Sequence, residues 1–282
     1  MDNTPETTAC LPEQSCFRKA AKTALYRDFG THILAFLLFL GFPASFFFAK
    51  TVFRCLAAQY LPQNLAEALD FTLTLAAVFL FLFPLPYGYF TFLKNALSAD
   101  RADLADLFIA FSSGSHYYRA VTLFLRLFIR AIPCFFLPLC LLAVTLFYRD
   151  GFITLPAIDF FGYDLTYTLL VTSVFALFFV AFLLYSRVLA VVPIVLARPG
   201  DSFARCYLLS HVCFFGKKRR LYGALFAILP FYILSVLTCG LFFFFFTAPY
   251  VMLLVTSFGL ACYEEENSRR NDSVGLFVDE CL

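Results

Sequence analysis

Residues 165–197 read LTYTLLVTSVFALFFVAFLLYSRVLAVVPIVLA, an apolar run in which Arg187 is the only charged side chain. A helix rises about 1.5 Å per residue, so one helix of this length would reach about 50 Å. The hydrocarbon core of a bilayer is only about 30 Å thick. The run therefore predicts a membrane-spanning helix over 165–185, a break near Arg187, and a segment over 188–197 in the interface or the cytoplasm. The pair Pro199-Gly200 ends it.

The composition of the whole chain favours the same environment. Of its 282 residues 62% are hydrophobic and only 14% are charged, and the mean hydropathy is +0.83. A soluble domain has roughly 45–50% apolar and about 25% charged residues. The net charge is only +2, and no basic groove with interleaved aromatic side chains follows from the pattern, which argues against a nucleic-acid partner. The solvent predicted for this fold is lipid.

Five more segments are long and apolar enough to span a bilayer. The six predicted spans are 33–49, 71–93, 131–148, 165–185, 222–237 and 242–262. They predict an all-α, polytopic transmembrane helical bundle. Around it the sequence divides into a polar N-terminal segment, 1–30, a transmembrane domain, 31–263, and a disordered tail, 264–282.

The distribution of positive charge predicts the orientation, because Lys and Arg on short loops stay on the cytoplasmic side. With six spans and a cytoplasmic N-terminus, all but three of the 21 Lys and Arg fall on one side. The three exceptions are Lys50, Arg54 and Arg149, which lie in predicted outer loops. Both termini are therefore expected in the cytoplasm, and the predicted location is a bacterial cell membrane.

Two amphipathic segments are predicted on the cytoplasmic side. In 100–111, which Asp100 can cap, one helical face is formed by Leu104, Leu107, Phe108 and Phe111. In 201–215 the apolar side is less regular and contains Phe203, Tyr207 and Phe214. Both segments are bordered by basic residues, as expected of helices that lie on a membrane surface.

Seven basic residues are candidate contacts for lipid headgroups or other anions: Arg126, Arg130, Arg187, Lys217, Lys218, Arg219 and Arg220. Arg126 and Arg130 share one helix face and could hold a phosphate or carboxylate, or simply extend to the interface. Arg187 lies near the predicted cytoplasmic boundary. Each of the four consecutive cations, 217–220, would gain about 1 kcal/mol from anionic cytoplasmic lipid. Membrane lipids are therefore the expected partners.

Three prolines are candidate helix-break positions. Pro84 and Pro86 fall in the second predicted span, and Pro249 falls in the last. A proline inside a helix frees a backbone carbonyl, and such breaks persist in a membrane where protein or water bonds to it. The breaks fit either plain kinks or discontinuous helices that line a cavity.

Catalytic and metal signatures are missing from the sequence. The histidines His32, His116 and His211 are isolated, and no G-x-S-x-G motif surrounds the serines. The ten cysteines contain no C-x-x-C pair, which favours buried free thiols over a disulfide framework or metal site. The sequence predicts no cofactor and no enzymatic activity.

Residues 201–263 resemble an uncharacterised family of six-helix integral membrane proteins from Gram-positive bacteria, catalogued as a domain of unknown function. The resemblance rests on Ser210-His-Val-Cys-Phe-Phe-Gly216-Lys217, Thr238-Cys-Gly240, Thr247-Ala-Pro249-Tyr250 and Tyr263. Members often carry Trp in the fifth span, where this chain has Phe231 and Tyr232 and no Trp anywhere. The resemblance implies six spans but no activity. A more distant resemblance is to the membrane domain fused to some bacterial glycerophosphodiester phosphodiesterases.

Two functions stay open at this point. The leading one is a non-enzymatic membrane protein that acts through lipids, a membrane-protein partner or a second copy of itself. The alternative is a transporter or permease subunit for a small or amphipathic solute, favoured by the prolines and by a possible internal repeat that relates Ser112 to Ser210 and Pro133 to Pro230.

Overall fold

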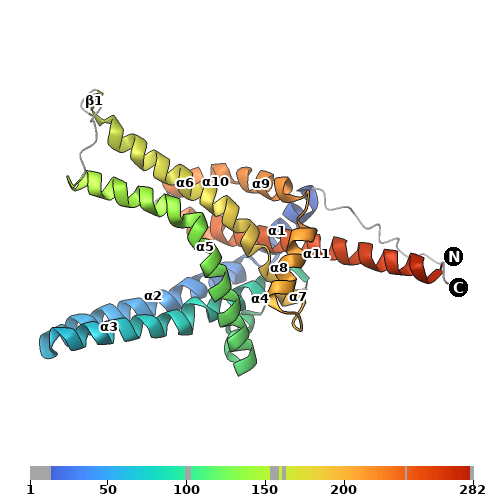
Figure 1. Ribbon diagram of the computed structural model, residues 1–282, viewed down its shortest axis with the longest axis horizontal. Coiled ribbons are helices and arrows are strands. Elements are labelled where there is room, and N and C mark those ends of the chain that lie inside the picture. The colour runs from blue at the N-terminus through green and yellow to red at the C-terminus, as the bar shows by residue number, and fades with distance from the viewer. Residues whose placement is uncertain (1–13, 99–102, 153–158, 161–162, 239, 280–282) are drawn as a thin grey trace. The chain divides into compact units, whose positions relative to one another are not determined.

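The computed structural model describes residues 14–98, 103–152, 159–160, 163–238 and 240–279 (Figure 1). The described residues are all helical or irregular apart from a pair of two-residue strands, β1 (Asp159–Phe160) and β2 (Tyr163–Asp164). It forms two compact units: unit 1 contains residues 1–124 and 190–282, and unit 2 contains residues 125–189. The helices in chain order are α1 (Gln14–Arg27), α2 (Phe29–Tyr60), α3 (Gln63–Ala77), the π-helical η1 (Val78–Leu82), α4 (Pro84–Ser98), the 3₁₀-helical η2 (Leu104–Phe111), α5 (Gly114–Arg149), α6 (Leu165–Leu189), α7 (Val192–Ala197), α8 (Phe203–Cys213), α9 (Lys218–Phe226), α10 (Leu229–Leu237), the π-helical η3 (Phe243–Thr247) and α11 (Ala248–Asp279).

Five described helical stretches are long and apolar enough to cross a membrane: Phe29–Leu56, Gln63–Ser98, Gly114–Arg149, Leu165–Ala197 and Phe245–Ser268. The first four bury only 11–24% of the residues in their most apolar windows, whereas the last buries 72%. Side chains such as Phe48 and Phe175 are 73% and 70% exposed. Apolar surface on this scale requires lipid around it. The predicted all-α membrane bundle is confirmed.

The fifth predicted span, 222–237, is split between α9 and α10. Pro230 has no N–H to donate to the carbonyl of Phe226, four residues earlier, so the helix cannot continue unchanged. The chain turns at 227–228, and the Phe231 N–H donates to the carbonyl of Ile228, only three residues back, at 2.8 Å. Counting this split segment, five to six helices can span.

The first two spans form a long helical hairpin, which corrects the predicted loop over 50–70. Helix α2 continues to Tyr60 and α3 begins at Gln63, and the two lie side by side (Figure 1). The Lys50 ammonium lies 3.1 Å from an Asp70 carboxylate oxygen and also donates to the Thr74 hydroxyl. Because the charges neutralise each other across the hairpin, they do not end the helices.

The break after Arg187 is confirmed within two residues. Helix α6 ends at Leu189, and α7 restarts at Val192 with Pro193 as its second residue. Four α7 residues, 192–195, are buried in unit 1. A Cβ on Gly259 of α11 would lie 2.5 Å from the Ala190 carbonyl oxygen and from Pro193 Cγ. The glycine lets α7 approach α11 closely, so 188–197 is packed against protein to an extent that the sequence did not predict.

A π-helical turn stands directly before two of the candidate prolines. Phe83 precedes Pro84, and its N–H donates to the Val78 carbonyl, five residues back, at 3.3 Å. The N–H of Ala248, which precedes Pro249, likewise donates to the carbonyl of Phe243. The wider turn relieves the clash between the proline ring and the preceding turn. Pro86 lies in the first turn of α4, where a missing N–H costs little.

One carbonyl freed by the first π turn is taken up by a tyrosine. The Tyr117 hydroxyl of α5 donates to the Phe79 carbonyl at 3.1 Å. Tyr117→Phe is expected to lower the free energy of unfolding by about 1 kcal/mol, the net value of one such hydrogen bond. Thermal unfolding of the detergent-solubilised protein measures this, with the exposed neighbour variant Tyr118→Phe as control. Equal midpoints for the two variants would contradict the role of Tyr117.

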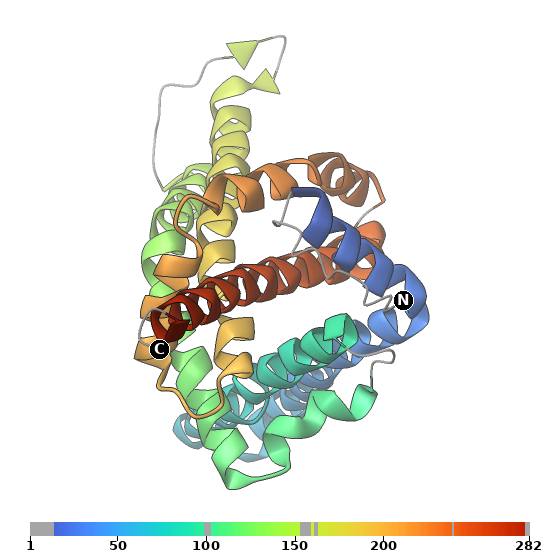
Figure 2. The same ribbon diagram turned by 90° about the vertical axis from the view of Figure 1, so that its right-hand side faces the viewer.

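The N-terminal segment contributes a packed helix rather than only a polar extension. Phe17, Ala21 and Leu25 of α1 are buried, and α1 lies along α11 (Figure 2). The ring of Phe17 meets that of Phe258 edge-on at 5.5 Å, and the Ser257 hydroxyl donates to the Phe17 carbonyl at 2.8 Å. The rest of the predicted segment, 1–13, lies outside the described residues.

The predicted disordered tail is also corrected. Helix α11 continues from the membrane to Asp279, so 264–279 is helical, and only 280–282 lies outside the described residues. The physical reason is propensity: the three consecutive glutamates 264–266 are strong helix formers directly after an established helix.

The first amphipathic segment is a 3₁₀ helix, which changes its buried face. Leu107 and Ala110, three apart, are buried, whereas Phe108 and Phe111 are partly exposed. With three residues per turn, positions i and i+3 align, so the face predicted for an α-helix is wrong for both phenylalanines. Asp103 caps the helix by accepting from the Ala105 N–H at 2.9 Å; the predicted cap, Asp100, lies outside the described residues.

Candidate functional site

The ends of α7, α8, α9 and the middle of α11 meet in unit 1 and bring basic, acidic and apolar side chains together. The C-terminal end of α7 leaves carbonyls without helical partners. Arg119 of α5 donates to one of them, the Val195 carbonyl, at 2.8 Å, and to two carbonyls just after the helix, those of Arg198 at 2.8 Å and of Pro199. Lys94 donates to the Leu196 carbonyl at 3.3 Å. Arg119 and Lys94, two of the cations expected on the cytoplasmic side, thus cap the C-terminal end of α7.

Arg198 links this cap to α11. Its guanidinium donates to the Tyr263 hydroxyl at 3.1 Å and to Asp201 at 3.0 Å, and it lies 5.5 Å from the centre of the Tyr263 ring. Asp201 also accepts from Arg205, at 3.2 Å. The hydrogen bonds to Tyr263 and then to Asp201 raise the pKa of Arg198, so the group stays charged.

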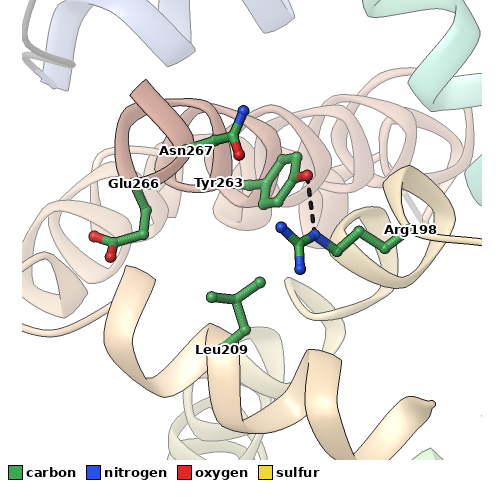
Figure 3. A pocket seen from close by; sticks show the side chains of 5 residues that line it. All are labelled: Arg198, Leu209, Tyr263, Glu266 and Asn267. Atoms are coloured by element: carbon green, nitrogen blue, oxygen red, sulfur yellow. Dashed lines mark hydrogen bonds between the residues drawn. The ribbon is translucent and has the colours of Figure 1, made fainter. Parts of the chain in front are cut away.

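The space beside Arg198 is a small pocket rather than a ligand site. Figure 3 shows Arg198, Leu209, Tyr263, Glu266 and Asn267 around it, with the Glu266 carboxylate turned away from Arg198. Its empty volume is about 160 Å³, with almost no space for a water-sized molecule. The hydrogen bond between Arg198 and Tyr263 therefore links the end of α7 to α11.

Helix α8 has one face packed on unit 1 and one face exposed. Phe203, Cys206 and Cys213 are buried, and burial raises the pKa of the Cys206 thiol. The exposed stripe consists of Leu208, Val212 and Phe215, which are 68%, 53% and 82% exposed. Leu208 and Val212 are four apart on one face of α8, and Phe215 lies two residues after the helix ends, in the turn that leads to α9.

The apolar residues predicted for one side of this segment are buried or half-buried against the protein. Phe203 is buried, and Phe214 packs its ring on Phe258 at 5.3 Å. The chain then reverses at Gly216, whose φ of +73° favours glycine, and α9 begins. Tyr207 is half-buried and stacks beside Phe203 at 6.1 Å.

A groove lies between the exposed face of α8 and α11. Its volume is about 440 Å³, and it is lined by His211, Val212, Phe215, Lys217 and Glu266. Lys217 lies 2.7 Å from the Glu265 carboxylate, and both side chains are largely buried at 13% and 12% exposure. The groove thus combines an apolar wall with side chains of both charges.

The structure divides the seven basic candidates between the two units. Lys217 immediately precedes α9, which begins with Lys218, Arg219 and Arg220, and Arg219 is exposed. The other three candidates, Arg126, Arg130 and Arg187, belong to unit 2. The Tyr185 hydroxyl of α6 donates to the Leu127 carbonyl of α5 at 3.5 Å. Arg187 therefore lies at about the same position along the two paired helices as Arg126 and Arg130.

Several residues of this site were not singled out from the sequence. Arg119, Arg198, Asp201 and Glu266 come from different parts of the chain, and only the Arg198-Asp201 spacing of three hinted at an ion pair. Tyr263 was named in the family resemblance, but not as a contact of Arg198. Within the described residues, no three His, Cys, Asp or Glu side chains gather closely enough to hold a metal ion.

Comparisons with known proteins add no relative. No family model matches the chain, and no match was found among curated proteins or solved structures. The resemblance of residues 201–263 to an uncharacterised family stays a prediction.

Proposed function

We propose that this chain is a non-enzymatic membrane protein that acts through contacts with membrane lipids at the α8 end of unit 1. The observation that carries the proposal is the exposed stripe formed by Leu208 and Val212 of α8 and by Phe215 in the turn after it, on a short helix whose other face is packed into unit 1. A helix with such a stripe and basic residues beside it lies in a lipid interface. The predicted leaflet is the cytoplasmic one of a bacterial cell membrane.

Charge near the stripe supports the same function. Arg205 and Arg219 are exposed on either side of it, and Lys218 is half-buried. Juxtamembrane cations of this kind are attracted to anionic lipid. A protein partner or a second copy of this chain is the competing occupant of the same stripe.

The chain contains no Trp, so one introduced tryptophan reports on a single place. In full-length Phe215→Trp reconstituted in vesicles, we expect blue-shifted emission that is strongly quenched by lipids brominated near the headgroup. The matched control is Ser268→Trp, at an exposed position farther along α11, where we expect emission typical of water and little quenching. Phe215→Trp emission that brominated lipid leaves unchanged would contradict the proposal.

A second function, transport of a small or amphipathic solute, is supported by one observation. The π turns before Pro84 and Pro249 both contact α2, so two irregular backbone segments pack against the same helix. Discontinuous helices often surround substrate sites in transporters. Uptake of labelled solutes into vesicles containing the protein tests this function, and no uptake across a broad panel would count against it.

A further inference from the structure

We infer that the α2–α3 hairpin binds a small, uncharged aromatic carbonyl compound, the chemical class of the quinones, in a pocket beside Lys50. The pocket lies between the two helices and has a volume of about 280 Å³. It is lined by Phe46, Ala49, Lys50, Phe53, Leu69 and Leu73. The site is separate from the lipid contacts proposed at α8 and does not depend on them.

The pocket lies within two membrane-spanning stretches. Its α2 residues belong to Phe29–Leu56 and its α3 residues to Gln63–Ser98, both long and apolar enough to cross a membrane. Side chains of the same hairpin such as Phe48 and Phe71 are 73% and 70% exposed, as expected where lipid surrounds the helices. A ligand therefore reaches the pocket from the hydrocarbon and has to be soluble in lipid.

The charge beside the pocket is already balanced. Of the six lining residues only Lys50 has a polar side chain, and its ammonium lies 3.1 Å from an Asp70 carboxylate oxygen. Both side chains of this ion pair are largely buried, at 14% and 21% exposure. A paired charge is tolerated in a membrane-spanning stretch, whereas a further, unbalanced charge is costly there. The pocket therefore favours an uncharged ligand over a carboxylate or an amine.

The Lys50 ammonium has one hydrogen-bond donor left for a ligand. It carries three N–H groups, and within the described residues its partners are the Asp70 carboxylate and the Thr74 hydroxyl. Thr74 donates its own hydrogen to the Asp70 carbonyl at 2.7 Å, so its oxygen is free to accept from Lys50. A carbonyl oxygen on the ligand can accept from the third N–H without adding charge.

The apolar walls fit a planar ring. Phe46 and Phe53 are seven residues apart on α2 and lie on one helix face with Lys50 between them. Aromatic side chains pack on other rings in offset or edge-on arrangements. Leu69 and Leu73 line the pocket from α3. The volume lies near the roughly 300 Å³ at which small-ligand pockets begin, which limits the ligand to a small ring system.

Fluorescence quenching in the full-length, detergent-solubilised protein tests the inference. Because the chain contains no Trp, Phe53→Trp reports on the pocket alone, and Phe48→Trp, on α2 but outside the pocket, is the matched control. We expect methylnaphthoquinone to quench Phe53→Trp with saturation and Phe48→Trp only in proportion to its concentration. Two competitors share its ring system: methylnaphthalene has no acceptor, and naphthoate has a carboxylate. Naphthoate is expected to compete more weakly than the quinone binds.

Variants in the Phe53→Trp background separate the hydrogen bond from the apolar walls. Lys50→Met combined with Asp70→Asn removes the donor without leaving an unpaired carboxylate. This pair of changes is expected to weaken quinone binding about tenfold and to leave methylnaphthalene binding unchanged. Arg54→Met, which removes an exposed cation one turn farther along α2, should affect neither ligand. Ala49→Phe fills the pocket and should abolish binding of both.

Quenching of Phe53→Trp that does not saturate would overturn the inference, as would quinone binding that is unchanged after the loss of Lys50. Naphthoate binding more tightly than the quinone would assign the pocket to an organic anion and would also overturn it. The result is independent of the Phe215→Trp measurement, so the lipid contacts at α8 and the ring site in the hairpin stand or fall separately.

Discussion

Gly88→Ala is expected to destabilise unit 1 by about 3 kcal/mol, the upper part of the range for overpacking a well-packed site. Gly88 lies in α4 where η2 packs against it, and a Cβ added there would collide with the carbonyl of Leu107. The obstacle is backbone, which cannot rotate away as a side chain can. The crossing is further held by Asn95, whose side-chain amide donates to Asp106 at 2.8 Å.

Buried thiols provide the measurement. Cys206, Cys213 and Cys262 are buried and become reactive on unfolding, whereas Cys55 and Cys140 are exposed and give a constant background. A thiol-reactive fluorophore should show a midpoint several degrees lower for Gly88→Ala. The control is Gly41→Ala in α2, where nothing lies within 4 Å of the added Cβ and alanine is the better helix former. A Gly88→Ala midpoint equal to that of Gly41→Ala would show that η2 is not packed tightly against α4 at Gly88.

Arg119→Gln is expected to cost about 2 kcal/mol and to loosen the α7 end of the candidate site. The guanidinium donates to three carbonyls at once, at Val195, Arg198 and Pro199. A hydrogen bond from a charged donor contributes roughly 1.5–3 kcal/mol, but the three act together and the group is partly exposed, so their values do not add.

Faster hydrogen exchange of the amides in α7 and the following turn would report this loss, alongside a lower unfolding midpoint. Arg119→Lys should recover only part of the stability, because one ammonium cannot reproduce the planar set of donors. Arg54→Gln, an exposed arginine of α2, is the matched control. Unchanged exchange in α7 after Arg119→Gln would mean that the helix end is satisfied without Arg119.

Much of the architecture is predictable because lipid imposes a simple length rule. The run 165–197 was too long for one crossing, and it does break before Pro193. The same rule overestimated the continuity of 222–237, where Pro230 divides the helix. Helix α1 could have been predicted, since Phe17, Ala21 and Leu25 recur at helical spacing, but the nearby cations suggested a polar segment.

The candidate site was predictable only in part. The basic run 217–220 stands out in the sequence, yet nothing local shows that Lys217 pairs with Glu265 or that Arg119 caps α7. The apolar residues predicted for one side of 201–215 are buried or half-buried, but the sequence alone did not show which apolar residues stay exposed, since Phe215 is as apolar as Phe203 and Phe214.

The sequence by itself determined the solvent of this protein, its helical class and the approximate ends of most of its apolar helices, because apolar length and proline act within one segment. Tertiary structure alone decided which faces are buried, which charges are paired and where α8 exposes its stripe. Those properties depend on contacts between residues far apart in the chain, such as Gly259 with Ala190, and no single segment encodes them.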